Sequence, residues 1–331
     1  MKMRRAAVAI ALAALAALAA GYTGLRLQRP YQGFRGETFV EIPRGTSSGA
    51  IAGLLAGAGV VRSRWDFLLA RWTTRRRVLQ AGEYRFDRPA SAREVVDRIA
   101  RGDIFYYDLV VPEGRNMFDI ANAVAQLGIF PAGRFLETAR NPSLIRDLDP
   151  QAPTLEGYLF PNTYRLTRHT TPEALCRMMT QKFREAWRKL GTTAAVHDTV
   201  TLASLVEKEG KLPEERPRIA AVFANRLRIG MKLDCDPTTI YAALLNHRYR
   251  GTIYRSDLES DNPYNTYRHA GLPPGPIANP GVASMEAVLQ PAESEALYFV
   301  LRPDGSGGHE FSSSIAAHQA ATRKYRRALQ R

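Results

Sequence analysis

Cysteine is scarce in this sequence, and histidine is not spaced for metal binding. The 331 residues include six histidines and two cysteines, Cys176 and Cys235. Two cysteines are too few for a disulfide framework or a cysteine-rich metal site, and the histidines show no metal-ligand spacing. We therefore expect no metal and no other cofactor. The two thiols could pair in an oxidising compartment or remain buried and free, and the sequence leaves both open.

Acidic residues are outnumbered by basic ones. The chain has 46 Lys and Arg against 32 Asp and Glu, a formal net charge of +14 and a pI near 10.0. This charge suggests an anionic neighbour such as phospholipid headgroups, an anionic polymer or nucleic acid. The basic residues are spread along the chain, and neither a zinc-finger pattern nor an RNA-binding aromatic signature is present. We therefore expect no nucleic acid partner and favour an anionic membrane surface.

The N-terminus contains a long uncharged run. Residues 6–25 carry no charge, and Lys2, Arg4 and Arg5 precede them. A helix of 20 residues at ~1.5 Å per residue just spans a bilayer core of about 30 Å. The basic end predicts a short cytoplasmic tip and a membrane anchor over residues 1–29, with the rest of the chain exported. The Ala-Leu-Ala at 17–19 would also serve as a signal-peptidase site, so a cleaved signal peptide is the alternative.

An internal repeat follows the uncharged run. Ile51-Ala52 recurs as Ile120-Ala121, and the segment 40–45 recurs as 109–114, at a constant offset of 69 residues. Each copy predicts a β-strand, a Pro-x-Gly turn and an amphipathic helix that buries its Ile-Ala pair.

Two helices and a second strand are predicted between the copies. The helices are expected over 60–72 and 91–101, the latter with a capping box between Ser91 and Glu94, and the strand over 81–86. The resulting βααβ unit over 37–108 resembles a LysM-type module, a small fold that often holds N-acetylated glycan. A spacer that holds the next domain away from the membrane is an equal alternative.

A glutamate stands where a helical pattern places an apolar side chain. In the segment 199–210, Leu202, Leu205 and Val206 precede Glu209 by seven, four and three residues, so all four share one helical face. Glu207 is predicted to point to the opposite side. Burial of a carboxyl group raises its pKa, which a general acid needs in order to hold a proton near neutral pH. The alternative is a glutamate that reaches out of the last turn into solvent.

The rest of the sequence predicts helices joined by loops. The predicted elements are, in chain order, an aromatic segment at 155–164 around Glu156, helices over 172–190 and 218–227, a helix that begins at Asp236 or Pro237, strands at 296–301 and 309–311, and a closing helix over 312–329. The stretch 262–281 is rich in Pro, Gly, Asn and Tyr, and an irregular loop of this length in a compact domain is expected to shape a site. The whole pattern predicts an α+β chain.

Six segments in order along the chain carry a resemblance to a known family. The segments 155–164, 203–209, 222–227, 236–238, 264–267 and 271–277 resemble the motif series of the endolytic murein transglycosylases, also called the YceG-like family. The resemblance implies an N-terminal anchor, the LysM-like module and a mixed α/β catalytic domain over 109–331. We divide that domain into a repeat-like linker subdomain at 109–150 and a transglycosylase core at 151–331.

The resemblance also implies an activity and a location. It implies a single-pass enzyme of the inner membrane whose catalytic domain is periplasmic. Such an enzyme is a lyase that cleaves the MurNAc–GlcNAc bond of nascent peptidoglycan strands, leaves 1,6-anhydro-MurNAc ends and so terminates strand elongation. Glycan strands would be the substrate, and peptidoglycan synthases are candidate partners. A lysozyme-like muramidase and a non-catalytic peptidoglycan-binding scaffold remain the alternatives.

In that family the essential acid is the second Glu of a Glu-x-Glu pair, which falls on Glu209 here. We expect further substrate contacts or supporting groups at Glu156, Asn225, Asp236, Tyr264, Asn265 and Thr266. The sequence departs from the family pattern at Asn162, where Asp is common, and at Gly210, which replaces Thr or Ser. The first departure puts any role of position 162 in doubt.

Overall fold

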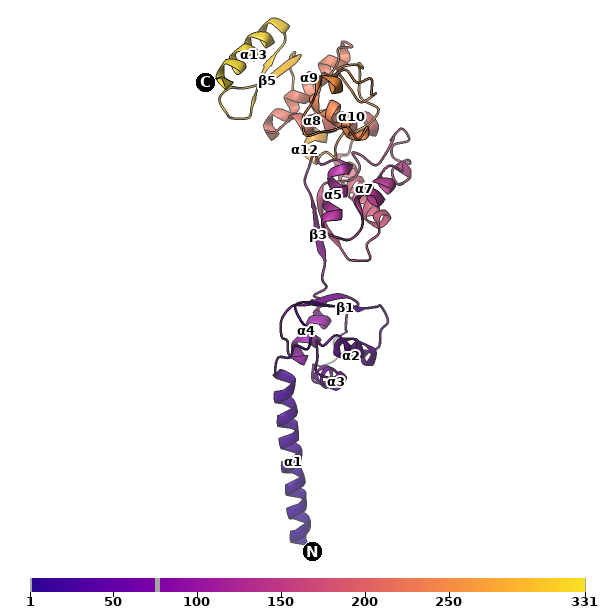
Figure 1. Cartoon of the computed structure of the whole chain (residues 1–331), viewed down its shortest axis with the longest axis vertical. Coiled ribbons are helices and arrows are strands. Elements are labelled where there is room, and N and C mark those ends of the chain that lie inside the picture. Colours follow the sequence, from indigo (N-terminus) through magenta and orange to yellow (C-terminus); the bar gives the residue numbers. More distant parts are fainter. Residues whose placement is uncertain (1, 75–77, 331) are drawn as a thin grey trace. The chain divides into compact units, whose positions relative to one another are not determined.

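The computed structural model describes residues 2–74 and 78–330, and the chain divides into two units, residues 1–106 and 107–331. Figure 1 shows the elements of each unit along the chain. Short antiparallel sheets of two strands each are embedded among helices, so the fold is a mixed α/β one with an N-terminal apolar helix.

The first unit begins with the apolar helix and continues as strand, two helices, strand and helix. Its elements are α1 (Lys2–Gln28), β1 (Thr38–Ile42), α2 (Ser48–Gly57), α3 (Arg64–Thr73), β2 (Gly82–Phe86) and α4 (Ala92–Arg101). Strands β1 and β2 pair antiparallel. The predicted Ser91–Glu94 capping box is present at the start of α4. The helix predicted over 60–72 begins later, at Arg64, because Ser63 caps it by accepting a hydrogen bond from the Asp66 amide.

The last turn of α1 belongs to the core of the first unit. Leu27 is 2% exposed and packs in the same cluster as Phe67 and Tyr84. The Arg26 guanidinium forms an ion pair with Asp66 on α3, with 2.9 Å between Nε and Oδ1. Over residues 6–28 this helix is long and apolar enough to cross a membrane, a test that a signal sequence also passes.

The second unit begins with the second copy of the repeat. Its first elements are β3 (Tyr107–Val111), α5 (Met117–Gln126), α6 (Ala132–Ala139), the 3₁₀ turn η1 (Pro142–Leu144), β4 (Asn162–Leu166) and α7 (Pro172–Leu190). Ile51, Ala52, Ile120 and Ala121 are all buried, as the repeat predicts. Strand β3 pairs antiparallel with β4. Both copies therefore continue through two helices to a partner strand and a further helix, and the β3–β4 sheet joins residues on both sides of position 150.

The remainder of the second unit is mainly helical. It contains α8 (Val196–Glu209), η2 (Pro213–Glu215), α9 (Arg216–Arg228), α10 (Asp236–Leu245), α11 (Arg255–Leu258), α12 (Val282–Leu289), β5 (Tyr298–Leu301), β6 (His309–Ser312) and α13 (Ile315–Leu329). Helix α8 packs against α9, α10 and α12. The stretch 262–281 is irregular, as predicted. It is nevertheless well packed, since Ile277, Ala278 and Asn279 are buried and the Ile277 amide donates to Ser204 Oγ on α8.

Candidate active site

Helix α8 places Glu209 at its last residue. The helix ends there because Gly210 leaves helical geometry, although its N–H still donates to the Val206 carbonyl at 2.8 Å. Leu205 and Val206 are fully buried, as the spacing predicts, and Glu209 itself is half-buried. Glu207 was predicted to lie on the side of the helix opposite this apolar face, and that side is also buried, with the Glu207 side chain only 5% exposed. Every residue over 199–206 is buried, because other elements cover both sides of the helix.

The carboxyl group of Glu209 contacts a thiol. Cys235 Sγ donates a hydrogen bond to Glu209 Oε1 at 3.3 Å. Burial raises the pKa of Glu209 above its ordinary value, and the nearby Asp236 carboxylate adds to the rise. The Cys235 thiol and the Lys208 ammonium act in the opposite direction because both stabilise the carboxylate. The structure therefore gives Glu209 the raised pKa that a general acid needs.

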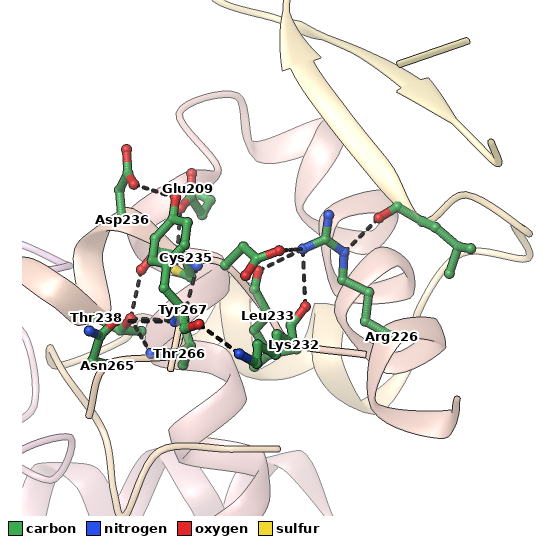
Figure 2. A network of polar contacts seen from close by, with 12 residues as sticks. Glu209, Arg226, Lys232, Leu233, Cys235, Asp236, Thr238, Asn265, Thr266 and Tyr267 are labelled. Atoms are coloured by element: carbon green, nitrogen blue, oxygen red, sulfur yellow. Dashed lines mark hydrogen bonds and ion pairs between the residues drawn. The ribbon is translucent and has the colours of Figure 1, made fainter. Parts of the chain in front are cut away.

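A second carboxylate lies on the exposed side of this site. Asp236, the first residue of α10, is exposed and accepts a hydrogen bond of 2.6 Å from the Tyr267 hydroxyl. Figure 2 shows Glu209, Cys235, Asp236 and Tyr267 gathered at one end of a polar network. Burial, and then this hydrogen bond, raise the pKa of Tyr267, so its hydroxyl remains a donor at neutral pH.

Two buried threonines form hydrogen bonds with the backbone of Cys235. Thr266 Oγ1 accepts a hydrogen bond from the Cys235 amide at 3.0 Å, and Thr238 Oγ1 donates to the Cys235 carbonyl at 2.6 Å. The two hydroxyls also contact each other at 2.8 Å. Both Thr238 and Thr266 are at most 1% exposed. Thr266, predicted as a substrate contact or a supporting group, therefore fixes the backbone of Cys235.

Asn265 organises the same loop. It is fully buried, and its amide nitrogen donates to the carbonyls of Leu258 at 2.9 Å and Ser260 at 2.7 Å. Its side-chain oxygen accepts a hydrogen bond from the Tyr267 amide at 3.1 Å. Asn265 thus aligns the segment that carries Thr266 and Tyr267.

The other end of the network is the guanidinium of Arg226. This side chain is buried and donates to the carbonyls of Leu233 at 2.8 Å and Leu297 at 2.6 Å. It also pairs with Asp234 at 3.7 Å. Asp234 has a positive φ of 45°, a conformation uncommon for a residue with a side chain. Arg226 therefore secures the strained turn that leads into Cys235.

Three of the predicted site residues make their contacts with parts of the protein other than Glu209. Asn225 is half-buried, and its amide nitrogen donates to the carbonyls of Ser294 at 2.7 Å and Ala296 at 3.1 Å. Tyr264 is 9% exposed, and its ring centroid lies 5.1 Å from that of Tyr241. These contacts hold loops in place.

Glu156 is the third. It is 1% exposed, and its oxygens accept hydrogen bonds from the Met117 amide at 2.9 Å and Asn279 Nδ2 at 2.8 Å. Burial raises its pKa to about 8. Glu156 supports the start of α5 and has almost no surface to offer a substrate.

Sequence reasoning missed Cys235, Tyr267 and the structural role of Arg226. All three lie inside or beside the motifs that carry the family resemblance, but a single buried cysteine gives no periodic signal in a sequence. Both cysteines are free and buried, so the structure contains no disulfide between Cys176 and Cys235. Among the residues that the structure describes, no group of His, Cys, Asp and Glu is arranged to hold a metal ion.

Comparison with known proteins finds relatives over most of the chain. The profile of the YceG-like family matches residues 40–324. A protein of Bacillus subtilis (strain 168) named endolytic murein transglycosylase is 32% identical over 307 residues, which cover 86% of this chain and 84% of that protein. A protein of the same name from Streptococcus pneumoniae (strain D39) is 31% identical over 79% of this chain, and the match spans about half, 53%, of its length. A crystal structure of a yceG-like protein from Listeria monocytogenes has a TM-score of 0.54 at 31% identity, and the match covers 87% of this chain and 99% of that chain.

Proposed function

Because the chain belongs to the YceG-like family, we propose that it is an endolytic murein transglycosylase that cleaves the MurNAc–GlcNAc bond within nascent peptidoglycan strands. The observation that carries the proposal is the state of Glu209. Its carboxyl group is half-buried, has a raised pKa and stands beside an exposed second acid, Asp236. A carboxyl group in such surroundings holds a proton that it can deliver to a substrate oxygen.

The proposed reaction uses one carboxyl group twice. Glu209 donates its proton to the glycosidic oxygen, and the bond from the muramic C1 to that oxygen breaks through an oxocarbenium-like state. The resulting carboxylate takes the proton from the C6 hydroxyl of the same sugar, whose oxygen bonds to C1. The products are a 1,6-anhydro-MurNAc end and a free GlcNAc hydroxyl. Because the nucleophile is already attached, its effective concentration is high and no water has to be activated.

The structural roles of the neighbouring residues follow from their exposure. Asp236 is exposed, Tyr267 is half-buried and hydrogen-bonded to it, and the Asp236 charge acts on Glu209, so we assign Asp236 and Tyr267 to the orientation of a substrate hydroxyl. Thr266 and Asn265 support the segment that holds Cys235 and Tyr267, while Tyr264 and Asn225 hold the surrounding loops. Glu156 is a buried support beneath the start of α5.

The first unit would hold the enzyme at its substrate. We assign α1 as a retained anchor that leaves residues 30–331 in the periplasm. Residues 37–108 would form a LysM-like module that grips glycan or sets the height of the catalytic domain. The strand-helix-helix-strand order of this unit and the family match from residue 40 support the assignment.

A basic helix at the C-terminal end of the second unit would bind the anionic membrane surface. Helix α13 carries Arg323, Lys324, Arg326 and Arg327, all exposed, and contains no acidic residue. Such a cluster attracts phospholipid headgroups through charge. Peptidoglycan synthases that supply the nascent strand remain candidate partners.

The test uses the full chain in detergent, with uncrosslinked glycan strands as substrate. Mass spectrometry of the products should show anhydro-muramic ends for the wild type and none for Glu209→Gln. Glu214→Gln, which changes an exposed acid in the turn after α8, is the matched control and should retain activity. Circular dichroism checks that all three proteins are folded.

The alternative functions give different products. A lysozyme-like muramidase would use Asp236 as its second carboxylate and give ends that are heavier by one water. A glycan-binding scaffold would give no cleavage with either the wild type or the variants. Either result would overturn the proposed function.

A further inference from the structure

We propose that Cys235 is a positioning residue that fixes which oxygen of Glu209 carries the catalytic proton. The thiol donates to Oε1, so the proton delivered to the glycan is held on Oε2. The catalytic meaning of this inference rests on the proposed function, but the contact itself can be tested without any substrate.

The direction of the hydrogen bond follows from the two groups. A carboxyl group that is buried beside another acid is favoured in its neutral form, in which one oxygen is a carbonyl and the other a hydroxyl. A donor that faces Oε1 at 3.3 Å favours the carbonyl character of that oxygen. The hydroxyl of the acid is then Oε2, the oxygen that we assign to the substrate.

The thiol remains a donor across the working pH range. Burial, and then the Glu209 charge, raise the pKa of Cys235 well above its ordinary value. The sulfur therefore keeps its proton at neutral pH and can donate to Glu209 whether that group is neutral or charged. Cys235 is 2% exposed, so solvent does not compete for the thiol.

The backbone of Cys235 is fixed at both ends. Its amide donates to Thr266 Oγ1, and its carbonyl accepts from Thr238 Oγ1. Cys235 also occupies the position just before the first turn of α10. The orientation of the thiol is thus set by the network beneath it.

The thiol also moderates the acidity of Glu209. The other charged groups that act on this carboxyl group are Asp236 at the start of α10 and Lys208 on α8, and Tyr267 reaches Asp236 from the loop. Burial and Asp236 favour the protonated form, whereas the thiol and Lys208 favour the carboxylate. A general acid must both hold and release its proton, so a weak donor suits this position.

Infrared spectroscopy tests the contact directly. The S–H stretching band lies in a spectral region free of other protein absorption, and Cys176→Ala in the full chain leaves Cys235 as the sole thiol. We expect this band to shift as Glu209 titrates, and the shift to vanish in Cys176→Ala/Glu209→Gln. A band that ignores pH, or that still responds in the Gln variant, overturns the proposal. If Cys176→Ala impairs folding, the difference spectrum between wild type and Cys235→Ala provides the same band.

Pairs of variants test the effect on catalysis. Cys235→Ala removes the donor, so the pH at which activity falls on the basic side should rise. Cys235→Ser keeps a donor, so this basic limb should lie at or below the wild-type position. A purely structural role would lower activity in both variants without displacing the limb. The proposal is overturned if Ala leaves the limb in place or if Ser displaces it as Ala does.

The two measurements separate the two proposals. If the wild type yields no anhydro product, the proposed function fails, while the infrared result still decides whether the thiol controls the carboxyl group. If the product forms but the band does not respond to Glu209, the proposed function stands and the role of Cys235 is refuted.

Discussion

The Glu207 carboxylate and the Arg216 guanidinium form an ion pair beneath the end of α8, with 2.9 Å between Oε1 and Nη2. The side chains of Glu207 and Arg216 are only 5% and 11% exposed. The second oxygen of Glu207 accepts hydrogen bonds from the Gly281 amide at 3.0 Å and Ser284 Oγ at 2.8 Å. One carboxylate therefore ties α8 to the starts of α9 and α12, two residues before Glu209.

Replacement of Glu207 by Gln should destabilise the second unit. Removal of one charge from a buried ion pair typically costs about 3 kcal/mol. Glu113, whose side chain is far more exposed and lies 3.6 Å from Arg216, is then the remaining carboxylate partner and compensates the guanidinium only in part. Urea unfolding measures this loss. Glu214→Gln should change stability by no more than about 0.5 kcal/mol, since that side chain is exposed. Equal midpoints for Glu207→Gln and wild type would show that the ion pair contributes nothing.

The charge of Asp236 should set the pH range of activity. Its negative charge raises the pKa of Glu209, and activity is lost as pH rises through that pKa because the catalytic proton leaves. Asp236→Asn removes the charge, so the basic limb of the pH–rate profile should move to lower pH. Measurement of kcat/KM for anhydro-product formation as a function of pH, in wild type and Asp236→Asn, shows in which direction the basic limb moves. A limb that stays in place or moves upward contradicts the role assigned to this carboxylate.

Glu156 should make the fold less stable as pH rises. Its folded pKa is about 8, above its ordinary value of 4.5, so the folded protein binds this proton more tightly than the unfolded chain. The resulting stabilisation is complete below the unfolded pKa and is lost as pH rises toward 8. Glu156→Gln should remove this dependence, with a gain over wild type of about 2–4 kcal/mol near pH 8 relative to about pH 5. Thermal unfolding at both pH values provides the comparison, and parallel curves would contradict it.

Gly157 should not tolerate a side chain. Its φ is 88°, and a Cβ atom there would lie 2.5 Å from Pro276 Cβ and 2.9 Å from Val200 Cγ1. Strain and overlap together should cost about 3 kcal/mol in Gly157→Ala. Gly128 has a similar φ of 71° with open space around it, so Gly128→Ala should cost only about 1 kcal/mol. Unfolding midpoints that rank the two variants the other way would show that the loop at Pro276 moves freely.

Local features of the fold were predictable because each depends on a few adjacent residues. The capping box of Ser91 and Glu94 is set by four consecutive positions. Thr171 and Pro172 start α7 in the same way, since a side-chain cap and a fixed φ need no distant partner. Errors of a few residues arose where a capping serine lies inside the predicted helix, as at Ser63 and Ser314.

The candidate site was only partly predictable. The spacing of apolar residues singled out Glu209, but it could not show that the opposite face of α8 is also covered and that Glu207 is buried there. The spacing also could not show which of the polar residues in the motifs face the substrate and which form hydrogen bonds inside the protein. Asn265 and Glu156 look like substrate contacts in sequence because both are polar residues in motifs, yet their hydrogen bonds are used inside the protein.

By itself, the sequence determined the repeat, the apolar N-terminal helix, most of the longer helices and the acid at the end of α8, since periodicity and capping act within a few residues. Strand β4 and helices α11 and α12 were not predicted. Only the tertiary structure decided the surroundings of that acid. Cys235 lies 26 residues after Glu209, and Tyr267 reaches Asp236 across 31 residues. Such contacts form only when loops close and neighbouring helices pack, and no local pattern encodes which side chains then meet.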